Sequence, residues 1–325
     1  MSTEHSHVDQ FGADGTLRHL LTLEGLGRDR IEALLDSAQK FVRPLGERPP
    51  SSTMLQGRTV ANLFTEPSTR TRVSFELAAK RLGADVVNLE VQLSSRVKGE
   101  SMLDTVFTLQ ALHVDVLVIR DSEAGVHELV AAHVEPHVSV LSAGEAHLSH
   151  PTQGLLDALT VRQHKGRFDT LSIAIVGDIK HSRVARSAWQ AFHTLGVPDI
   201  RIVAPAALMP EATEFEGCGR FTSLRTGLKD VDVIMMLRIQ RERMGQAALP
   251  DADRYFAKYG LSPERLALAR HDAIVMHPQP MNRGIEIASD VADGPQSVIR
   301  DQVRNGVAVR MAVLAAVCGA RMRSA

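Results

Sequence analysis

Short apolar runs alternate with stretches of helical periodicity along most of this chain, and this alternation predicts its fold. In the first half, strands are expected at 59–64, 85–89, 114–119 and 138–142, with helices at 69–82, 101–112 and 125–132. In the second half, strands are expected at 171–176, 200–203, 231–237 and 273–276, with helices at 182–195 and 262–269. Such alternation is typical of parallel sheets with helical crossovers, so the expected class is α/β.

Breaks in the pattern predict the domain organisation. Helical periodicity begins near Leu20 and continues to Phe41, where prolines end it. A long helix is expected from Pro151 toward His164 and opens the second half. We therefore expect a flexible tail at 1–17, α/β domains of similar size at 18–150 and 151–304, each a parallel sheet flanked by helices, and a C-terminal helix at 305–325 that returns to the first domain.

Composition narrows the function without identifying it. The chain has 325 residues, of which 44% are hydrophobic and 23% charged, as in ordinary globular proteins. A net charge of −1 and an aromatic content of 4% argue against partners such as nucleic acid or an anionic membrane. Cys218 and Cys318 show neither metal-ligand spacing nor a disulfide framework. With a polar N-terminal segment and no apolar run of bilayer length, this predicts a cytoplasmic protein.

The segment 64–72, Phe-Thr-Glu-Pro-Ser-Thr-Arg-Thr-Arg, carries the strongest chemical signal. It joins a predicted strand to a predicted helix, where backbone N–H groups and the helix dipole form an anion site. Ser68 or Thr69 could simply cap the helix. Arg70 and Arg72, however, fall in the first helical turn, where the dipole disfavours cations. That placement indicates an anionic partner, so the segment predicts phosphate binding without a glycine-rich loop.

Polar side chains follow the other predicted strands, and arginine recurs among them. Ligands of open α/β sheets bind beyond the carboxyl ends of the strands, so these positions form the candidate site. They are Arg120, then His147, His150 and Gln153, then Asp178 to Arg183, then Arg238 and Gln240, and finally His277 to Pro280. Together they predict a basic cleft between the domains for ligands with several negative charges.

Other chemistries fit these residues less well. Gly177 opens a strand-to-helix turn, but the second and third glycines of a dinucleotide-binding fingerprint are missing. His147 and His150 have no further ligands nearby, so we expect no metal. No arrangement of side chains suggests a nucleophile for a covalent intermediate. Lys98 lies in the polar segment 94–101, which from the residues alone is better explained as a solvated loop.

Taken in order, these motifs resemble the carbamoyltransferases, and among them the aspartate carbamoyltransferases, from about Arg18 to Met322. The pattern Phe-x-Glu-x-Ser-Thr-Arg-Thr at 64–71 is similar to the carbamoyl phosphate signature of the whole superfamily. The segment 237–243, Leu-Arg-Ile-Gln-Arg-Glu-Arg, resembles the aspartate loop, and His-Pro-Gln-Pro at 277–280 resembles the His-Pro-x-Pro element of the aspartate enzymes. The sequence lacks the cysteine after this histidine and the Asp-x-x-Ser-Met-Gly motif that mark ornithine enzymes.

The resemblance implies an activity and a role for each matching residue. The chain would transfer the carbamoyl group of carbamoyl phosphate to the α-amine of L-aspartate, as in pyrimidine (UMP) biosynthesis, through a tetrahedral intermediate and without metal or cofactor. Carbamoyl phosphate would be held by Ser68, Thr69, Arg70, Thr71, Arg120, His150, Gln153, Gln279 and Pro280. The implied catalytic residues are Arg70, Thr71, Lys98, Arg120 and His150, and the implied aspartate ligands are Lys98, Arg183, Arg238 and Gln240. Glu66 would pair with Arg183 and Arg243 on domain closure. A cis peptide is implied at Gln279-Pro280, where the general preference is trans.

The resemblance also implies a homotrimer with shared active sites, which Lys98 and Ser94 would enter from the neighbouring subunit. Ser95 follows Ser94, so either hydroxyl could match the serine of the family. Regulatory chains or a dihydroorotase-like partner are compatible with the sequence. Three alternatives stay open: a carbamoyltransferase for another amino acid such as ornithine, a catalytically silent paralogue, and a nucleotide-binding dehydrogenase.

Overall fold

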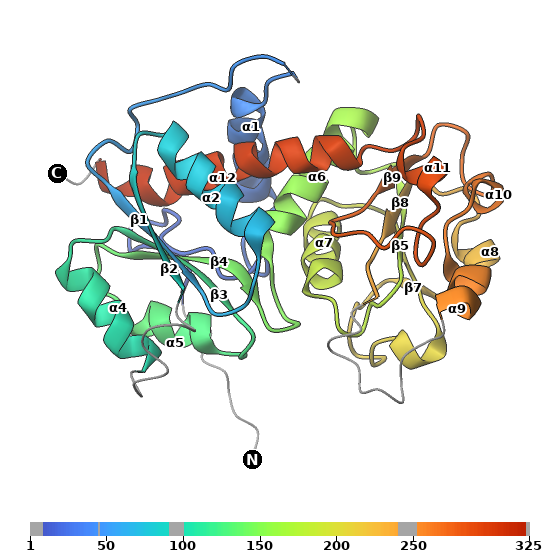
Figure 1. Cartoon of the computed structure of the whole chain (residues 1–325), viewed down its shortest axis with the longest axis horizontal. Coiled ribbons are helices and arrows are strands. Elements are labelled where there is room, and N and C mark those ends of the chain that lie inside the picture. Colours follow the sequence, from blue (N-terminus) through green and yellow to red (C-terminus); the bar gives the residue numbers. More distant parts are fainter. Residues whose placement is uncertain (1–8, 45, 91–100, 240–251, 323–325) are drawn as a thin grey trace. The chain divides into compact units, whose positions relative to one another are not determined.

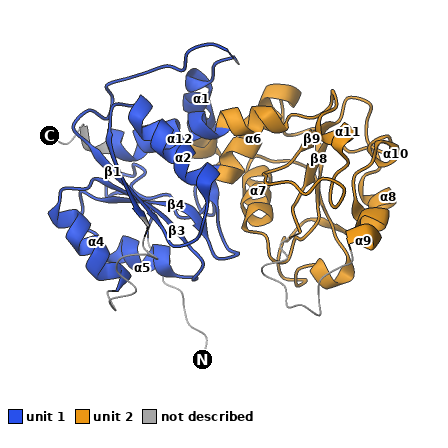
Figure 2. Ribbon diagram, in the orientation of Figure 1, with its two compact units in different colours: residues 1–26, 32–152, 306–325 blue, residues 27–31, 153–305 orange. Residues whose placement is uncertain are grey.

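The computed structural model describes residues 9–44, 46–90, 101–239 and 252–322. The chain divides into two compact units, with residues 1–26, 32–152 and 306–325 in unit 1, and residues 27–31 and 153–305 in unit 2 (Figure 2). Each unit has a parallel sheet flanked by helices, and the end of the C-terminal helix belongs to unit 1. The α/β class expected from the alternating pattern is confirmed.

Unit 1 is built on a parallel sheet with the strand order β2-β1-β3-β4. Its strands are β1 (Thr59–Phe64), β2 (Asp85–Glu90), β3 (Val116–Asp121) and β4 (Ser139–Glu145). Its helices are α2 (Thr69–Arg81), α4 (Met102–Ala111), α5 (Val126–His133), most of α1 (Arg28–Phe41) and most of α12 (Ile299–Met322). Helices α4 and α5 cover one face of the sheet, and α2 lies on the other (Figure 1). Alternate strand residues such as Leu63 and Ile119 pack with Val106 and Val130 of these helices.

Unit 2 is built on a second parallel sheet with the order β7-β6-β5-β8-β9. Its strands are β5 (Ser172–Val176), β6 (Asp199–Val203), β7 (Gly219–Phe221), β8 (Val233–Met236) and β9 (Ile274–Met276). The helices in its sequence range are most of α6 (Pro151–Lys165), α7 (Arg183–Thr194), the 3₁₀ turn η2 (Ala206–Leu208), α8 (Leu224–Gly227), α9 (Ala252–Tyr259), α10 (Pro263–Leu266), α11 (Ser289–Ala292) and the start of α12 (Ile299–Met322).

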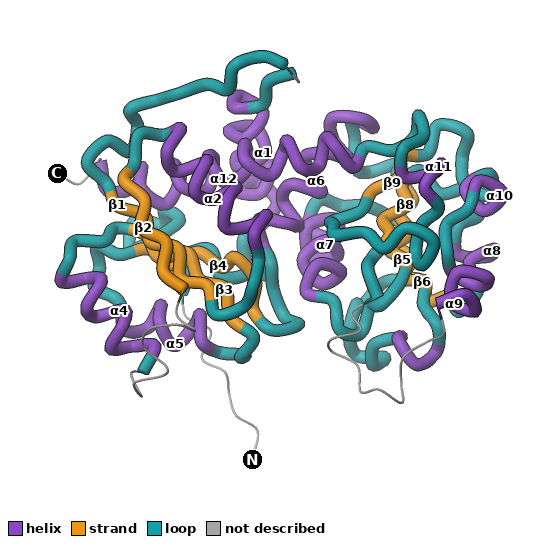
Figure 3. The backbone as a smooth tube through the Cα atoms, in the orientation of Figure 1, coloured by secondary structure: helices purple, strands orange, loops and turns teal. Residues whose placement is uncertain are grey.

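Strand order reverses once in each sheet, and these reversals locate the ligand-binding positions. In unit 1 the chain proceeds from β1 outward to β2 and then returns to β3 on the other side of β1. In unit 2 it proceeds from β5 through β6 and β7, and returns to β8 on the other side of β5 (orange strands in Figure 3). Open parallel sheets bind ligands at such reversals, beyond the carboxyl ends of the two flanking strands. The loops after β1, β3, β5 and β8 are therefore the candidate ligand-binding loops.

The helix expected to begin near Leu20 begins only at Arg28. Leu20 instead extends the edge of the first sheet, because its N–H donates to Val140 O over 2.9 Å and its carbonyl accepts from Ser142 N over 2.8 Å. Gly27, with φ of 78°, then turns the chain into α1. The apolar residues 20 and 23 are spaced as in a helix. The backbone hydrogen bonds of Leu20 to β4, however, hold this segment in an extended conformation.

The described part of the N-terminal segment is folded, although we expected a flexible tail over residues 1–17. Gln10 is buried, and its Oε1 accepts hydrogen bonds from Leu21 N and Thr22 N at 2.6 and 3.1 Å. A polar side chain that satisfies buried backbone donors gives this segment a fixed place.

Several element boundaries also differ from the sequence-based expectation. Helix α12 begins at Ile299 rather than near residue 305, and α10 ends at Leu266 rather than at 269. The short elements β7, α8 and α11 have three or four residues, too few to show a clear period in the sequence. Their positions depend on packing within unit 2.

Candidate active site

The turn after β1 presents the start of α2 at the strand reversal of unit 1. Ser68 occupies the N-cap position, but in the described chain its side chain makes no capping hydrogen bond. Thr71 is buried, whereas Thr69 and Arg70 are exposed. Capping, the simpler interpretation of the serine, is therefore not its role here. The first N–H groups of α2 and the hydroxyl of Ser68 are suited to an anionic ligand.

Arg120 is fixed beside this turn by two kinds of contact. It lies within β3, opposite Phe64 of β1, because the strand continues two residues past the predicted end. Its Nε donates to Glu66 Oε2 over 3.2 Å, and its Nη1 donates to Ala143 O over 3.2 Å. The two charged side chains are only 13% and 17% exposed. The strand reversal between β1 and β3 thus brings together Arg120, which we predict to bind carbamoyl phosphate, and Glu66, which we predict to act in domain closure.

His150 is held at the start of α6 by the turn that precedes it. Glu145 N donates to Ser149 O over 2.8 Å, and the Ser149 hydroxyl donates to Leu21 O over 2.8 Å. His150 itself is 4% exposed. Burial raises the pKa of the Glu145 carboxyl, but its hydrogen bond and charge interaction with His127 outweigh burial and leave the pKa below its ordinary value. The carboxylate accepts from Gly125 N over 2.7 Å and therefore ties the end of β4, where this turn begins, to the start of α5.

Arg183 is the first residue of α7, at the strand reversal of unit 2. Ser182 caps the helix, and its hydroxyl accepts from Ala185 N over 3.1 Å. Arg183 is only 6% exposed. A buried guanidinium at the positive end of a helix is suited to an anionic ligand, because the dipole alone disfavours a cation there.

Arg238 lies just beyond β8, and a close backbone approach sets its position. Leu237 N donates to Val176 O of β5 over 2.7 Å. Gly177 has φ of 132°, and a Cβ built on it would lie 2.7 Å from Leu237 O. Only glycine leaves room for this approach. Gly177 does not belong to a dinucleotide-binding fingerprint. It allows Leu237 to approach closely, and this places Arg238 beside the loop that leads to Arg183.

The segment 277–280 forms a tight loop after β9. The Gln279-Pro280 peptide is cis, as the resemblance implies, and Gln279 has φ of 58°. Gln279 N donates to His277 Nδ1 over 2.9 Å, and His277 Nε2 lies 3.2 Å from Glu286 Oε1. Because a backbone N–H can only donate, Nδ1 must be unprotonated, and Nε2 carries the proton toward Glu286. The imidazole therefore ties the loop to a fully buried carboxylate.

Gln153 is connected to this loop through residues that sequence reasoning did not single out. Gln153 Nε2 donates to Asp157 Oδ1 over 3.0 Å, and Gln302 Nε2 donates to the same oxygen over 2.8 Å. Gln302 Oε1 accepts from His277 N over 2.8 Å. Asp157 is fully buried and Gln302 is 2% exposed. The spacing of four residues between Gln153 and Asp157 on one helix face could have indicated the first of these contacts.

Part of the predicted site lies outside the described residues. These positions are Ser94, Lys98, Gln240 and Arg243. His147, which follows β4 in the sequence, is exposed, while His150 three residues later is buried.

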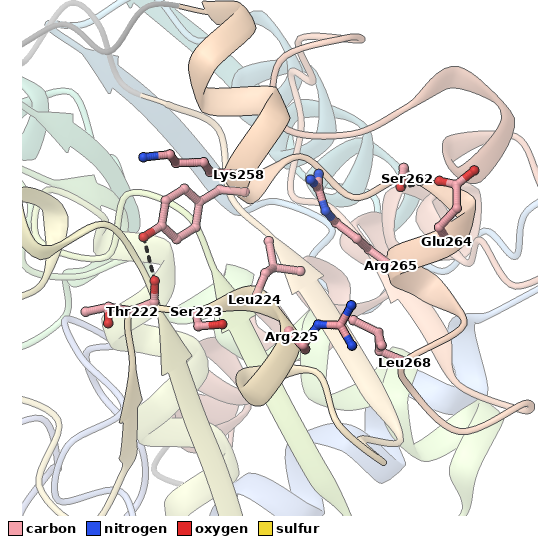
Figure 4. A pocket seen from close by; sticks show the side chains of 10 residues that line it. Thr222, Ser223, Leu224, Arg225, Lys258, Ser262, Glu264, Arg265 and Leu268 are labelled. Atoms are coloured by element: carbon pink, nitrogen blue, oxygen red, sulfur yellow. Dashed lines mark hydrogen bonds between the residues drawn. The ribbon is translucent and has the colours of Figure 1, made fainter.

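A pocket of about 630 Å³ in unit 2 contains none of the predicted site residues. It is lined by α8, α9 and α10, with Arg225 and Lys258 among its side chains (Figure 4). Arg265 also faces it, but its guanidinium donates to the carbonyls of Phe256 and Ala257 at the end of α9. Arg265 thus has a structural role, because it caps the C-terminal end of α9.

Other reaction types find little support in the residues that the structure describes. Over the described ranges, no group of three or more His, Cys, Asp and Glu side chains is arranged to hold a metal ion. Burial raises the pKa of the Cys218 thiol to about 12, so it is not poised as a nucleophile. No described helix is both long enough and apolar enough to cross a bilayer.

Two family models match the chain in succession. Residues 18–163 match the aspartate/ornithine carbamoyltransferase model for the carbamoyl-P binding domain, and residues 169–317 match the model for the Asp/Orn binding domain. The chain belongs to the aspartate/ornithine carbamoyltransferase family. It is therefore a carbamoyltransferase, as the motif at 64–71 indicates.

Solved structures from both branches of this family are similar to the chain. Aspartate transcarbamoylase from Trypanosoma cruzi, in complex with carbamoyl aspartate and phosphate, is 33% identical with a TM-score of 0.83, covering 94% of this chain and 98% of that one. The same enzyme with N-(phosphonacetyl)-L-aspartic acid is also 33% identical, with a TM-score of 0.82 and coverage of 94% and 98%. Ornithine carbamoyltransferase from Pyrococcus furiosus is 30% identical, with a TM-score of 0.80 and coverage of 93% and 97%. Similarity over the whole chain thus identifies the family but does not distinguish aspartate from ornithine as the second substrate.

Gly177→Ala should destabilise this carbamoyltransferase more than Gly217→Ala does. Both glycines have positive φ, 132° and 79°, but a Cβ on Gly217 would meet no atom within 4 Å. Backbone strain alone costs about 1 kcal/mol, and the contact with Leu237 O adds to it only at Gly177. Urea unfolding of the two variants measures the difference. Equal losses would show that the close approach does not constrain this turn.

Proposed function

We propose that this carbamoyltransferase uses L-aspartate as the acceptor and forms N-carbamoyl-L-aspartate and phosphate, a step of pyrimidine biosynthesis. The observation that carries the proposal is the placement of Arg183 and Arg238 beyond neighbouring strands of unit 2. Aspartate brings two carboxylates, and two guanidiniums match them. Ornithine has one carboxylate and a side-chain ammonium, which a second arginine would repel. The free cysteines agree with a reducing cytoplasm.

The loops at the reversal of unit 1 would hold carbamoyl phosphate. The phosphate would lie against the first turn of α2, with Ser68, Thr69, Arg70 and Thr71 as its ligands. The carbamoyl end would meet Arg120, His150 and Gln153, together with backbone groups of Gln279 and Pro280.

Transfer requires an uncharged amine, a polarised carbonyl and a stabilised leaving group. Cations around the acceptor favour loss of the proton from its α-amine. The amine nitrogen then attacks the carbamoyl carbon, and negative charge develops on the carbonyl oxygen, where Thr71, Arg120 and His150 would donate. The C–O bond to phosphate breaks as the tetrahedral intermediate collapses, and the phosphate takes the proton from the amine. Positioning of two reactants can contribute as much as ~7–11 kcal/mol to such a reaction.

A homotrimer with shared sites fits the exposed surface of unit 1. Val73 and Leu77 on α2 and Val87 on β2 are 43%, 40% and 40% exposed. The two elements adjoin, because Asn88 on β2 donates to Glu76 on α2 over 3.0 Å. An apolar patch of this kind is suited to contact with another subunit. We propose that such contact brings Lys98, and Ser94 or Ser95, into the site of the neighbour.

Product assays with aspartate, ornithine and acetylornithine test the acceptor. We expect carbamoyl transfer to aspartate alone. Arg238→Ala should raise the KM for aspartate by roughly 10- to 100-fold, because a charge-assisted pair is lost, while carbamoyl phosphate binding stays unchanged. Arg225→Ala, an exposed arginine of the same unit, is the control and should leave both constants unchanged. Transfer to ornithine would identify the other branch of the family.

His150→Ala should lower turnover roughly 10²–10³-fold, as expected for the loss of one oxyanion donor. Binding of carbamoyl phosphate should weaken less, because the phosphate ligands remain. Stopped-time product assays and calorimetric titration measure the two effects separately. Wild-type turnover in this variant would remove His150 from the mechanism.

Mixing two inactive variants tests whether sites are shared. Lys98→Ala and Arg70→Ala each remove one ligand of every site, but mixed trimers would contain some sites with both native residues. We expect partial activity after subunit exchange. If exchange is demonstrated by mass and activity stays absent, the sites are self-contained.

A further inference from the structure

A single buried carboxylate accepts hydrogen bonds from two glutamine amides in unit 2. Asp157 Oδ1 accepts from Gln153 Nε2 and from Gln302 Nε2, at 3.0 and 2.8 Å. Gln302 Oε1 accepts from the backbone N–H of His277 over 2.8 Å, and that N–H can only donate. The amide of Gln302 therefore has one possible orientation, with its nitrogen toward Asp157.

The amide of Gln153 contacts the same carboxylate. Gln153 turns its amino group toward Asp157, and the Nε2–Oδ1 distance is 3.0 Å. Its Oε1 is then directed away from that carboxylate, and within the described parts of the chain this oxygen accepts no hydrogen bond. Gln153 is 8% exposed and lies one turn after His150 at the start of α6. The network thus presents an acceptor atom, rather than a donor, for a ligand at this helix start.

We propose that Asp157 is a positioning residue that gives the site its preference for a carbamoyl group. The carbonyl oxygen of a carbamoyl group can only accept a hydrogen bond, whereas its amino group donates. The Oε1 of Gln153, as oriented by Asp157, is complementary to that amino group alone. An acetyl group has a methyl in the same place and offers no donor. The proposal rests on the proposed function for its ligand, carbamoyl phosphate, and does not depend on which amino acid accepts the carbamoyl group.

The second branch of the network acts on the other predicted contact with the carbamoyl end. Through Gln302, Asp157 anchors the backbone of His277, and His277 Nδ1 in turn accepts from Gln279 N over 2.9 Å. Asp157 thus aligns the side chain of Gln153 and the loop that carries Gln279. Other links between α6 and α12 are independent of it, such as the 2.9 Å contacts of Asn305 with Thr160 and of His164 with Asp301. Loss of Asp157 should therefore affect recognition beyond its effect on packing.

The test compares the affinities of carbamoyl phosphate and acetyl phosphate by calorimetric titration of the full chain. Asp157→Leu keeps the shape of the side chain and removes both acceptors, which frees the Gln153 amide to reverse. We expect the preference for carbamoyl over acetyl phosphate to fall about 10-fold, since a hydrogen bond is replaced by two facing donors. Asp157→Asn, which keeps an oxygen at the Oδ1 position, should retain the preference. Asp301→Leu, which removes another carboxylate between α6 and α12, should retain it as well.

Each outcome bears on the proposal. If Asp157→Leu fails to fold, Asp157→Ser replaces it with the same expected loss, because the smaller side chain leaves room for water beside the two amides. An unchanged preference in a folded variant overturns the role of Asp157, as does an equal loss in Asp301→Leu, which would show a general effect of packing. Failure of the wild-type chain to bind carbamoyl phosphate at all would overturn the proposed function and, with it, the ligand named here. A neutron structure with the Gln153 oxygen toward Asp157 would also overturn the proposal.

Discussion

The arrangement depends on one electrostatic constraint: guanidiniums lie where helix N-termini already carry positive charge. Arg70 follows the N-cap of α2, and Arg183 is the first residue of α7. Each position is unfavourable for a cation on the helix dipole alone. An anionic ligand would make this arrangement favourable, because the N–H groups, the helix dipole and the guanidinium would all attract the same negative charge. Both strand reversals are thus suited to anionic groups, and every member of this family binds the phosphate of carbamoyl phosphate and the α-carboxylate of an amino acid.

Buried carboxylates give these cationic loops a fixed geometry. Glu66 pairs with Arg120, Glu145 ties the end of β4 to the start of α5, Asp157 accepts from Gln153, and Glu286 lies beside His277. Each carboxylate accepts a hydrogen bond from one of the surrounding groups, which limits the orientation of that group. Groups held in place in this way need little reorganisation when charge develops on a reacting carbonyl. In the proposed reaction the acidic residues would therefore act on the substrates indirectly, by limiting the conformations of the groups that contact them.

Local pattern predicts the strands well and the strand order not at all. The apolar run 59–64 predicts β1 because a strand buried on both faces needs consecutive apolar residues. Leu20 is mispredicted because its pairing with β4 joins residues about 120 positions apart, which no local window records. For the same reason, the motif at 64–72 indicates an anion site, but only the order β2-β1-β3-β4 shows that Arg120 lies beside it. Asp157 and Gln302 are 145 residues apart, so their contact is likewise a property of the fold.

The two units match models for different substrates, which explains why similarity over the whole chain does not identify the amino acid that accepts the carbamoyl group. Carbamoyl phosphate is common to the whole family, and its predicted ligands lie mainly at the reversal of unit 1. Residues 169–317 match the Asp/Orn binding domain model, and in our proposal a few side chains after β5 and β8 distinguish a dicarboxylate from an amino acid with a cationic side chain. Relatives of both kinds share the fold at about 30% identity. The proposed preference for aspartate rests on Arg238 and on the glycine that lets Leu237 approach the end of β5, because a second guanidinium matches a second carboxylate and repels a side-chain ammonium.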